Sequence, residues 1–273
     1  MLEDLYRFYN RNVFPKINHI RGTTRFKLIL RDLLLRDVEK VNYEDEHDIF
    51  SQEWENLIII DACRQDYWEE ETGMEGSRIS KASSTYEYIE DYFSKGDYSD
   101  FVYVSANPQF SDKQFKELTG RKPEEVFHSI FKTFNTDWDD DAKTVLPKDT
   151  IRDGLTARKM FPDKRVIIHF LPPHYPFVRE PVTKGGFGSE KSARTESAWD
   201  LAEKGKVEQK VVEDAYRDNM RYIYNHILDL AEKLGGKTFL TSDHGNFVGE
   251  NGVYAHPKNR MEKPVKKVPW TEI

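Results

Sequence analysis

Four short apolar runs, rich in residues that favour strands, constrain the fold of this chain more than any other feature of its sequence. Helical patterns separate the runs, and each run is bounded by loop-forming residues. Because the runs are apolar almost throughout, we expect strands that are covered by helices on both faces. The alternation predicts a three-layer α/β/α fold around a mostly parallel mixed sheet. The predicted strands are 57–60, 101–104, 166–170 and 238–241, and the predicted helices are 85–93, 124–134, 149–160 and 207–234.

Composition excludes several classes of protein. The 273 residues suit one large α/β domain, and the 13% of aromatic residues can build a core although the mean hydropathy is −0.75. No apolar run approaches the ~20 residues of a transmembrane helix, and the first residues lack the pattern of a secretory signal. A single cysteine excludes a disulfide framework, and a net charge of −7 argues against nucleic-acid binding. We therefore expect a cytoplasmic enzyme, and the sequence leaves its oligomeric state open.

Two segments lie outside the alternation of strands and helices. Residues 1–50 are predicted to form a helical extension that packs on a catalytic domain of residues 51–273. Within the extension, residues 25–36 combine basic and apolar side chains, so a helix that touches a membrane surface is the alternative to one packed on the flank of the domain. Residues 180–206 are polar and contain Gly and Ser, which predicts a long loop that is either a mobile lid or a passive surface segment.

Polar residues follow three of the predicted strands. Asp61 follows the first, His174 comes shortly after the third, and the pair Asp243-His244 comes shortly after the last. In α/β sheets the ligand-binding crevice lies beyond the carboxyl ends of the strands, so we expect these side chains to converge. Carboxylate oxygen and imidazole nitrogen together suit Zn²⁺ or Mn²⁺ better than Ca²⁺ or Mg²⁺. A single Asp after a strand is commonly a turn or helix cap, whereas an Asp-His pair before a glycine has little structural reason to be there.

Three motifs, in this order along the chain, resemble the alkaline phosphatase/sulfatase-like superfamily, most closely its short prokaryotic sulfatase-like members with an Asp-Ala-Cys-Arg motif. They are Asn56–Tyr67, which contains Asp61-Ala-Cys-Arg64, His169–Pro176 and Leu240–Gly245. The resemblance covers roughly residues 50–273 and implies a metal-dependent enzyme with a Ser, Thr or modified Cys nucleophile. It implies metal binding by Asp61, Asp243 and His244, and contact of His174 and His256 with an anionic substrate or with a second metal.

The sequence departs from the family pattern at two places. Formylglycine sulfatases carry Cys-x-Pro-x-Arg, but Arg64-Gln-Asp-Tyr67 follows Cys63, so that type of sulfatase is not expected and Cys63 is predicted to be a small buried residue. Two-metal members carry Asp-x-x-x-His near the third strand, where this chain has His169-Phe-Leu-Pro-Pro-His174 without an acidic partner. One divalent ion is therefore expected, with a second ion as the alternative and His169 in the core or beside the ligands. The remaining histidines are expected to be structural or exposed: His19, His47, His128 and His226.

The resemblance places the nucleophile after the first metal-binding Asp, at the start of a helix. Ser83, Ser84 and Thr85 occupy that place, where the amides and dipole of a helix N-terminus would stabilise an oxyanion. Thr85 is slightly favoured over Ser84, and one of the two is also expected to cap the helix in a capping box with Glu87. Arg64 lies one turn beyond Asp61, where it would either clamp the anion or form a structural salt bridge.

Three functions are consistent with these residues. The leading hypothesis is a metal-dependent hydrolase or transferase that acts through a Ser or Thr nucleophile on a phosphate ester, with sulfate as the less favoured ester. The first alternative is phosphoryl-group transfer onto a surface glycan or lipid precursor that residues 180–206 would hold. The second alternative is an anion-binding protein that kept the fold and lost turnover. The presence of all five candidate metal- and anion-binding residues argues against it: Asp61, His174, Asp243, His244 and His256. Metal analysis and a panel of nitrophenyl phosphate and sulfate esters would distinguish the three.

Overall fold

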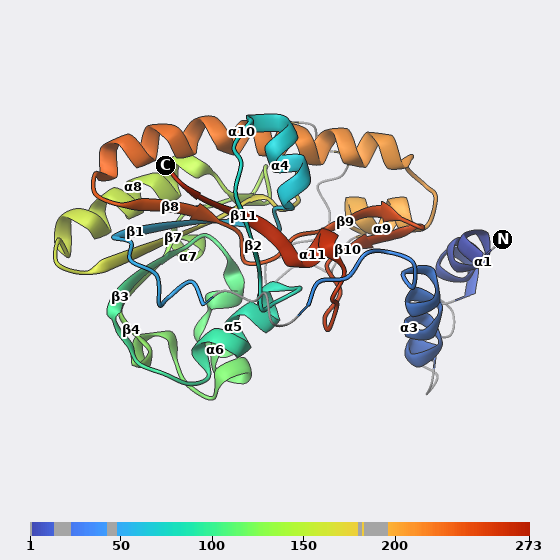
Figure 1. Ribbon diagram of the computed structural model, residues 1–273, viewed down its shortest axis with the longest axis horizontal. Helices are drawn as coiled ribbons and strands as arrows, with labels where there is room; N and C mark the ends of the chain where they lie inside the picture. Colours follow the sequence, from blue (N-terminus) through green and yellow to red (C-terminus); the bar gives the residue numbers. More distant parts are fainter. Residues whose placement is uncertain (1, 14–22, 43–47, 180–181, 183–195) are drawn as a thin grey trace.

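A seven-stranded sheet lies between two layers of helices in the computed structural model, which describes residues 2–13, 23–42, 48–179, 182 and 196–273 (Figure 1). Its strands are β1 (Asn56–Asp61), β2 (Ser77–Ile79), β3 (Tyr98–Ser105), β4 (Phe127–Lys132), β7 (Arg165–Pro173), β8 (Thr238–Thr241) and β11 (Lys267–Glu272). They are ordered β2-β11-β8-β1-β7-β3-β4. The strands from β8 to β4 are parallel, and β11 is antiparallel to both of its neighbours. The predicted three-layer fold with a mostly parallel mixed sheet is confirmed, and the four predicted strands are β1, β3, β7 and β8.

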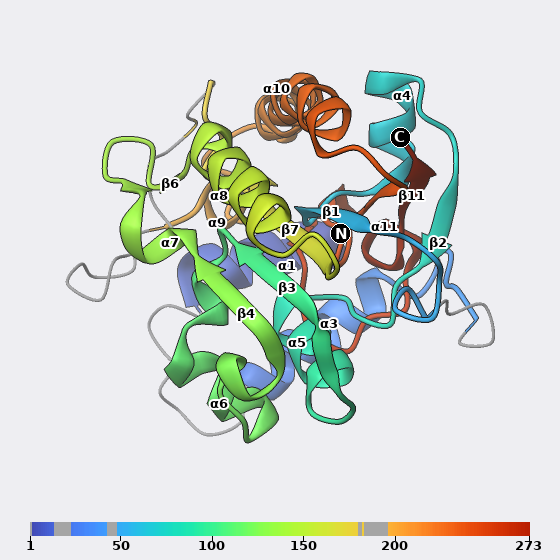
Figure 2. The ribbon, with the colours of Figure 1, turned by 90° about the vertical axis from the view of Figure 1, so that its left-hand side faces the viewer.

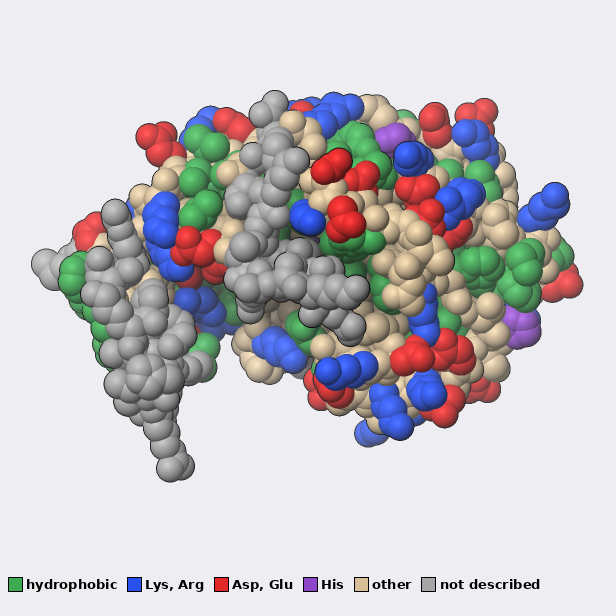
Figure 3. Space-filling view, turned by 180° about the vertical axis from the view of Figure 1, so that it is seen from behind, with side chains coloured by type: hydrophobic (Ala, Val, Ile, Leu, Met, Phe, Trp, Pro, Cys, Tyr) green, Lys and Arg blue, Asp and Glu red, His purple; other side chains and the backbone are tan. Residues whose placement is uncertain are grey.

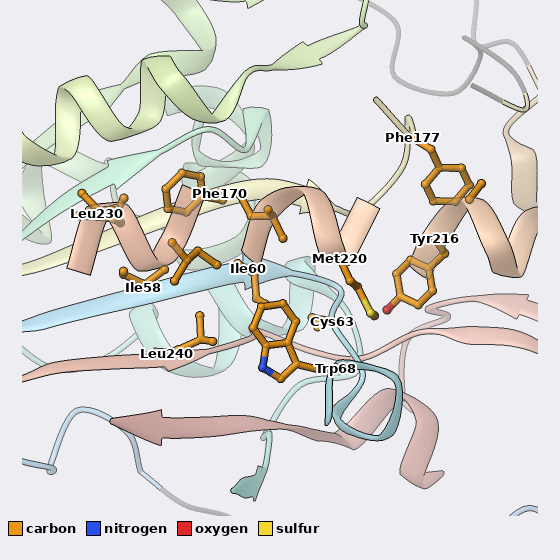
Figure 4. Packing of buried hydrophobic residues seen from close by; sticks show 14 of the residues in the cluster. Ile58, Ile60, Cys63, Trp68, Phe170, Phe177, Tyr216, Met220, Leu230 and Leu240 are labelled. Carbon is orange, nitrogen blue, oxygen red and sulfur yellow. The ribbon is translucent and has the colours of Figure 1, made fainter. Parts of the chain in front are cut away.

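Alternate residues of β1 face opposite helical layers, which explains why the strand is apolar throughout. Ile58 and Ile60 pack with side chains of α4 (Gln65–Thr72), α8 (Pro147–Met160) and α10 (Gln209–Leu234) (Figure 4). Leu57 and Ile59 pack with aromatic side chains of α5 (Thr85–Phe93) and α6 (Asp112–Thr119) on the other face. Figure 2 shows α8 and α10 on one side of the sheet and α5 and α6 on the other. The helices predicted over 85–93, 149–160 and 207–234 are therefore present as α5, α8 and α10.

Residues 124–134 form a strand, so the prediction of a helix there is wrong. The segment begins in the 3₁₀ turn η4 (Pro123–Glu125), continues as β4 and ends in the short helix α7 (Thr133–Thr136). The ring of Phe127 lies 5.0 Å from that of Phe93 and 4.9 Å from that of Tyr103, measured between centroids. Pairing with β3 and this aromatic packing favour the extended backbone, because aromatic side chains fit the pleated face of a sheet.

The predicted loop at 180–206 contains a helix in the part that the structure describes. Ser197 and Asp200 form a capping box at the start of α9 (Ala198–Glu203), and Trp199 in its first turn is buried. A cap followed by a buried aromatic residue therefore makes this part of the segment helical, where the sequence analysis predicts a loop. Residues 180–181 and 183–195 lie outside the described residues, as do His19 and His47.

The remaining elements are short. The pairs β5–β6 and β9–β10 each form a two-stranded antiparallel sheet. Within the described residues, none of the helices combines the length and the hydropathy that crossing a lipid bilayer requires. The elements are α1 (Leu2–Phe8), the π-helical turn η1 (Tyr9–Val13), α3 (Thr23–Leu34), η3 (Pro108–Phe110), β5 (Trp138–Asp139), β6 (Thr144–Val145), β9 (Phe247–Glu250), β10 (Val253–Ala255) and α11 (Lys263–Lys266).

The helices α1 and α3 lie at one end of the molecule, beyond the β9–β10 hairpin and α9 (Figure 1). The inner faces of both helices are apolar and buried, and they share a cluster with the hairpin and with α11. Burial of this apolar area holds the two helices on the sheet domain. The buried members of the cluster are Tyr6, Tyr9, Leu30, Leu34, Leu35, Phe247, Val253 and Val265.

The carboxylate of Glu203, at the end of α9, joins both N-terminal helices to the sheet domain. Tyr6 donates its hydroxyl proton to Glu203 at 2.6 Å, and Lys27 and Arg31 form ion pairs with the same carboxylate at 3.0 and 3.3 Å. Burial, together with the Glu203 charge, raises the pKa of Tyr6, so its hydroxyl stays a donor. These directional contacts fix the orientation of α1 and α3, which apolar packing alone would leave less defined.

Candidate active site

The carboxyl ends of the parallel strands meet at one edge of the sheet, and the three predicted metal ligands come together there. Asp61 is the last residue of β1, and Asp243 and His244 follow β8, which is the neighbour of β1 in the sheet. One ligand atom from each of the three lies within 4.8 Å of the other two, and all three side chains are buried. A single cation can therefore contact all three residues at once.

Of the three hydroxyl groups predicted as nucleophiles, the structure brings that of Thr85 to this cluster. Its Oγ1 lies 2.8 Å from Oδ2 of Asp243 and 3.1 Å from Nε2 of His244. Ser84 is the N-cap of α5, where its Oγ accepts from the amide of Glu87 at 3.4 Å. Ser83 donates its hydroxyl proton to the Glu87 carboxylate at 2.6 Å. The helix start thus divides two tasks between adjacent residues, because one hydroxyl caps the helix and the next faces the carboxylates.

Each of the two carboxylates has one oxygen that is held by the protein and one that faces the cluster. Oδ1 of Asp243 accepts from the amides of Ala62 at 3.1 Å and His244 at 2.9 Å, which leaves Oδ2 towards Thr85. Oδ2 of Asp61 accepts from the side-chain amide of Asn107 at 2.5 Å. Its Oδ1 is buried and has no hydrogen-bond partner among the described residues. A buried carboxylate oxygen without a donor is costly, and a cation would satisfy it.

Electrostatics favours a cation at this position. Burial and the neighbouring Asp243 charge raise the pKa of Asp61 well above its usual range, since two carboxylates in a site from which water is excluded repel each other. His244 donates from Nδ1 to the carbonyl of Gly245 at 2.7 Å, because a carbonyl can only accept. Its Nε2 therefore presents a lone pair to the cluster, and burial lowers the pKa of His244 to about 3, so the ring is neutral.

The backbone after β8 can reach this position only because Gly245 has no side chain. A Cβ atom there would lie 2.1 Å from the carbonyl oxygen of Pro264. The amide of Gly245 donates to the carbonyl of Val265 at 2.8 Å, so two chain segments run in close contact beneath the ligand pair. This explains physically why a glycine follows the Asp-His pair.

Two carboxylate oxygens, one imidazole nitrogen and one hydroxyl oxygen are a donor set that fits one divalent cation. Four mixed nitrogen and oxygen donors are typical of Zn²⁺ and are also compatible with Mn²⁺. The orphaned Oδ1 of Asp61, the lone pair of His244 and the Oδ2 of Asp243 that accepts from Thr85 lie close together. The residues that are present therefore fit the predicted metal.

His174 and His256, predicted to contact an anion, lie beside the cluster and face each other. Their Nε2 atoms are 3.0 Å apart, and the His256 ring centroid is 4.4 Å from that of His244. His174 Nδ1 lies 2.6 Å from the carbonyl of Tyr175, and because a carbonyl can only accept, this nitrogen carries the proton of the neutral ring. His174 Nε2 is therefore the acceptor, and His256 Nε2 donates to it. His256 Nδ1 is then a buried acceptor without a partner in the described part of the chain. Burial lowers the pKa of His174 to about 3 and that of His256 well below its usual value.

Arg64 lies beside the site, but two carboxylates occupy its guanidinium group. It pairs with Asp66 and Glu250, each at 2.6 Å, and it lies over the ring of Tyr67 at 4.1 Å from the centroid. These contacts correspond to the structural salt bridge that is the alternative to anion binding in the sequence analysis. Cys63 is fully buried, as predicted, and burial raises the pKa of its thiol, which suits a packing role.

Asn107 is a residue of the site that was not predicted from the sequence, and His169 was predicted only to lie in the core or beside the ligands. Asn107 follows β3 and orients the Asp61 carboxylate, and the signal that could have found it is its place just beyond a predicted strand. His169 is buried in β7, as expected, with Nδ1 2.9 Å from the hydroxyl of Tyr103. Its Nε2 lies 3.9 Å from Oδ2 of Asp61 and 4.0 Å from Oδ2 of Asp243. These distances are longer than hydrogen bonds, and Nε2 of His169 has no hydrogen-bond partner among the described residues.

The buried imidazoles should make the metal-free protein sensitive to acid. Burial lowers the pKa of four histidines in the folded protein, namely His169, His174, His244 and His256. Unfolding between about pH 4 and 6.5 therefore takes up protons, and the free energy of unfolding decreases as the pH is lowered through this range. The raised pKa of Asp61 acts in the opposite direction for one proton. Unfolding thus takes up about three protons in total. The free energy of unfolding should fall by at most about 4 kcal/mol for each unit by which the pH is lowered. Urea unfolding at pH 7, 6 and 5 measures it, and equal stability at all three would contradict it.

Comparison with known proteins identifies the fold. No protein-family model matches the chain, and no curated protein does. Among solved structures, the chain is similar to the integral membrane protein lipooligosaccharide phosphoethanolamine transferase A from Neisseria meningitidis, with a TM-score of 0.54 and 13% identity over 98% of this chain and 58% of that one. The soluble domain of the same transferase gives a TM-score of 0.51 and 13% identity, over 86% of this chain and 80% of that one.

A third solved structure carries the name of the superfamily in its description. It is a protein in the alkaline phosphatase superfamily from Vibrio parahaemolyticus, with a TM-score of 0.45 and 11% identity over 88% of this chain and 67% of that one. The chain spans little more than half of the length of the full transferase. At these identities the similarity describes the fold, and the chemistry has to be argued from the side chains.

Proposed function

Because the chain shares its fold with lipooligosaccharide phosphoethanolamine transferase A, we propose that it is a metal-dependent hydrolase or transferase of phosphate esters with Thr85 as its nucleophile. One observation carries the proposal: the buried Thr85 hydroxyl lies within hydrogen-bond distance of both Asp243 Oδ2 and His244 Nε2. A threonine that only capped its helix would direct its oxygen to the backbone amides, which Ser84 already serves. The donor set around Thr85 supports metal dependence.

The proposed reaction proceeds in two displacements on phosphorus. Asp61, Asp243 and His244 would hold one divalent cation, whose charge lowers the pKa of the nucleophile and stabilises the phosphoryl oxygens. In the structure the Thr85 hydroxyl donates to Asp243 Oδ2 at 2.8 Å. When the cation binds, the hydroxyl would lose that proton to water, and the Thr85 oxygen then forms a bond to phosphorus as the bond to the leaving oxygen breaks. Water or an acceptor alcohol then attacks phospho-Thr85 and releases the threonine. The amides of the first turn of α5 that Ser84 does not cap would donate to the phosphoryl oxygens.

His174 and His256 are assigned to the non-bridging oxygens of the substrate. The two rings share one proton between their Nε2 atoms, so both can donate to an anion only if the pair takes up one more proton. We therefore expect sulfate, which does not titrate near neutrality, to inhibit more tightly as the pH falls from 8 to 6. Inhibition constants measured across that range test this, and His256→Gln should remove most of the dependence. Inhibition that is independent of pH in the wild-type protein would contradict the assignment.

A substrate panel tests the proposed function. The protein is stripped of metal, reloaded with Zn²⁺ or Mn²⁺ and assayed with nitrophenyl phosphate monoester, phosphodiester and sulfate. We expect turnover of a phosphate ester that depends on the metal, with sulfate slower. Failure of every ester with both metals, together with the absence of phosphorylated Thr85 in mass spectra, would favour the third hypothesis, a protein that binds anions without turnover.

Transfer to a glycan or lipid acceptor is the second candidate. Its support is that two of the most similar structures are described as phosphoethanolamine transferase A and its soluble domain. A transferase passes the phosphoryl group from threonine to an alcohol, whereas a hydrolase passes it to water. The two are distinguished by adding glycerol or a short-chain diacylglycerol to the nitrophenyl assay. A transferase would release nitrophenol faster and form a new phosphodiester or monoester, and a hydrolase would release inorganic phosphate at an unchanged rate.

A further inference from the structure

The exposed apolar side chains of this protein are concentrated on α1 and α3. In the described part of the chain, ten large hydrophobic side chains are exposed, and seven of them lie on these two helices. The most exposed of the seven is Phe8, at 58%. Scattered single apolar residues are normal on a protein surface, but a group of this size on adjacent helices indicates a contact surface. The apolar face, as we name it, consists of Leu2, Leu5, Phe8, Phe26, Leu28, Ile29 and Leu33.

Helical spacing places most of these residues in two outward stripes. Leu2, Leu5 and Phe8 follow one another every three residues, and Phe26, Ile29 and Leu33 are spaced by three and four, so each set lies along one side of its helix. A different side of each helix is buried against the β9–β10 hairpin, and Glu203 fixes both helices through Tyr6, Lys27 and Arg31. The apolar face is therefore displayed by helices whose orientation is set by other contacts. Figure 3 shows hydrophobic side chains at the end of the molecule that carries these helices.

The charge of the same region is opposite to that of the rest of the chain. Residues 1–36 contain eight Lys and Arg against three Asp and Glu, in a chain whose net charge is −7. Residues 37–273 are therefore strongly acidic, and the sequence concentrates positive charge in the segment that contains the apolar face. Among the described side chains of this segment, Arg7 pairs with Glu3, Arg36 pairs with Asp37, and Lys27 and Arg31 share the single carboxylate of Glu203, while Asp32 pairs with Arg260.

We infer that the apolar face docks the protein on an anionic lipid surface, with α1 and α3 lying in the plane of the interface. Leu, Ile and Phe side chains in a segment rich in Lys and Arg are the composition of helices that bind in this way. The basic residues are attracted by the headgroups, and the apolar stripes enter the boundary between headgroups and acyl chains. A protein partner or a second copy of the chain would cover the apolar face as well, and the experiment below distinguishes a lipid surface from a second copy. The inference does not depend on the reaction proposed above.

Vesicle co-sedimentation tests this inference with the full-length protein. Vesicles of phosphatidylcholine with about a third phosphatidylglycerol are compared with vesicles of pure phosphatidylcholine, at low and high salt. We expect the wild-type protein to sediment with the anionic vesicles and to be released by high salt. The variant Leu5→Gln/Phe8→Gln/Ile29→Gln/Leu33→Gln should bind at least tenfold more weakly. These side chains are 46–58% exposed, so the fold should survive, and circular dichroism and the melting temperature check that it does.

The other three exposed apolar residues provide a matched control. Met160, Val211 and Leu228 are 60%, 47% and 41% exposed and lie on α8 and α10. Met160→Gln/Val211→Gln/Leu228→Gln should bind the anionic vesicles as the wild-type protein does, and so should Thr85→Ala, which separates docking from turnover. The inference is overturned if the wild-type protein stays in the supernatant with anionic vesicles, or if the control binds as weakly as the quadruple variant. It is also overturned if light scattering shows a wild-type dimer that the quadruple variant dissociates, because the occupant would then be a second copy.

Discussion

Replacement of Thr85 by alanine should remove nearly all turnover while leaving the metal site and the fold in place. We expect kcat to fall by about 10⁴-fold or more, because no covalent intermediate can form without the attacking oxygen. The metal affinity should change far less, since the two carboxylates and the imidazole of His244 remain. Steady-state kinetics with the best nitrophenyl ester, metal titration by calorimetry and mass spectrometry of the quenched reaction measure the three quantities.

The two neighbouring hydroxyls provide controls for this prediction. Ser84→Ala removes the N-cap of α5 and should lower stability by about 1 kcal/mol while turnover continues. Ser83→Ala removes a contact with Glu87 and should also leave turnover in place. Thr85→Ser keeps the oxygen and should keep a substantial part of the activity. If Thr85→Ala retained more than a tenth of the wild-type kcat, the covalent mechanism would be wrong.

Asp61→Asn should have opposite effects on the metal-free and the metal-bound protein. The metal affinity is expected to fall by about 100-fold or more, because a neutral amide replaces a charged ligand. The metal-free protein is expected to become more stable by about 1–3 kcal/mol at pH 8, since the substitution removes a buried charge beside Asp243. The amide oxygen can still accept from Asn107, and the amide nitrogen would replace Oδ1, which lies 3.7 Å from the Nε2 lone pair of His244.

Thermal unfolding with excess chelator and with excess Zn²⁺ separates the two effects. The wild-type melting temperature should rise strongly on addition of Zn²⁺, whereas that of Asp61→Asn should start higher and rise little. Asp140→Asn, at a position where the carboxylate is 84% exposed, should change neither value. A metal-free Asp61→Asn protein that melts below the wild type would show that the carboxylate is stabilised by something other than a cation.

The strand ends explain how much of the site could be predicted from the sequence. Hydrophobic runs locate buried parallel strands, and parallel strands bring the residues at their carboxyl ends to one edge of the sheet, so Asp61, Asp243 and His244 could be grouped before their distances were known. The choice among adjacent hydroxyls could not be made in the same way. Which of them faces the carboxylates depends on where α5 begins, and a shift by one residue turns a side chain through about 100°.

The features that the sequence did not predict depend on contacts between distant segments. The role of Asn107 depends on the position of β3 beside β7, and the pairing of Arg64 with Glu250 depends on the path of the β9–β10 hairpin. The hydrophobic periodicity of the segment 124–134 is compatible with both a helix and a strand, and the sequence analysis predicts a helix. Pairing with β3 makes the segment a strand. Local patterns therefore located the elements, and the tertiary structure selected among the local alternatives.

The position of β11 has a consequence for the synthesis of this protein in the cell. That strand, made of residues 267–272, lies inside the sheet between β2 and β8, and the segment before it supports the backbone of Gly245 through Pro264 and Val265. During translation, Asp61 and Thr85 emerge from the ribosome early, yet the turn that carries Asp243 and His244 cannot be fixed until residues 264–272 have emerged as well. Metal capture is thus coupled to the emergence of residues 264–272, so a nascent chain that stalls before residue 264 carries all of the ligands and cannot assemble the site.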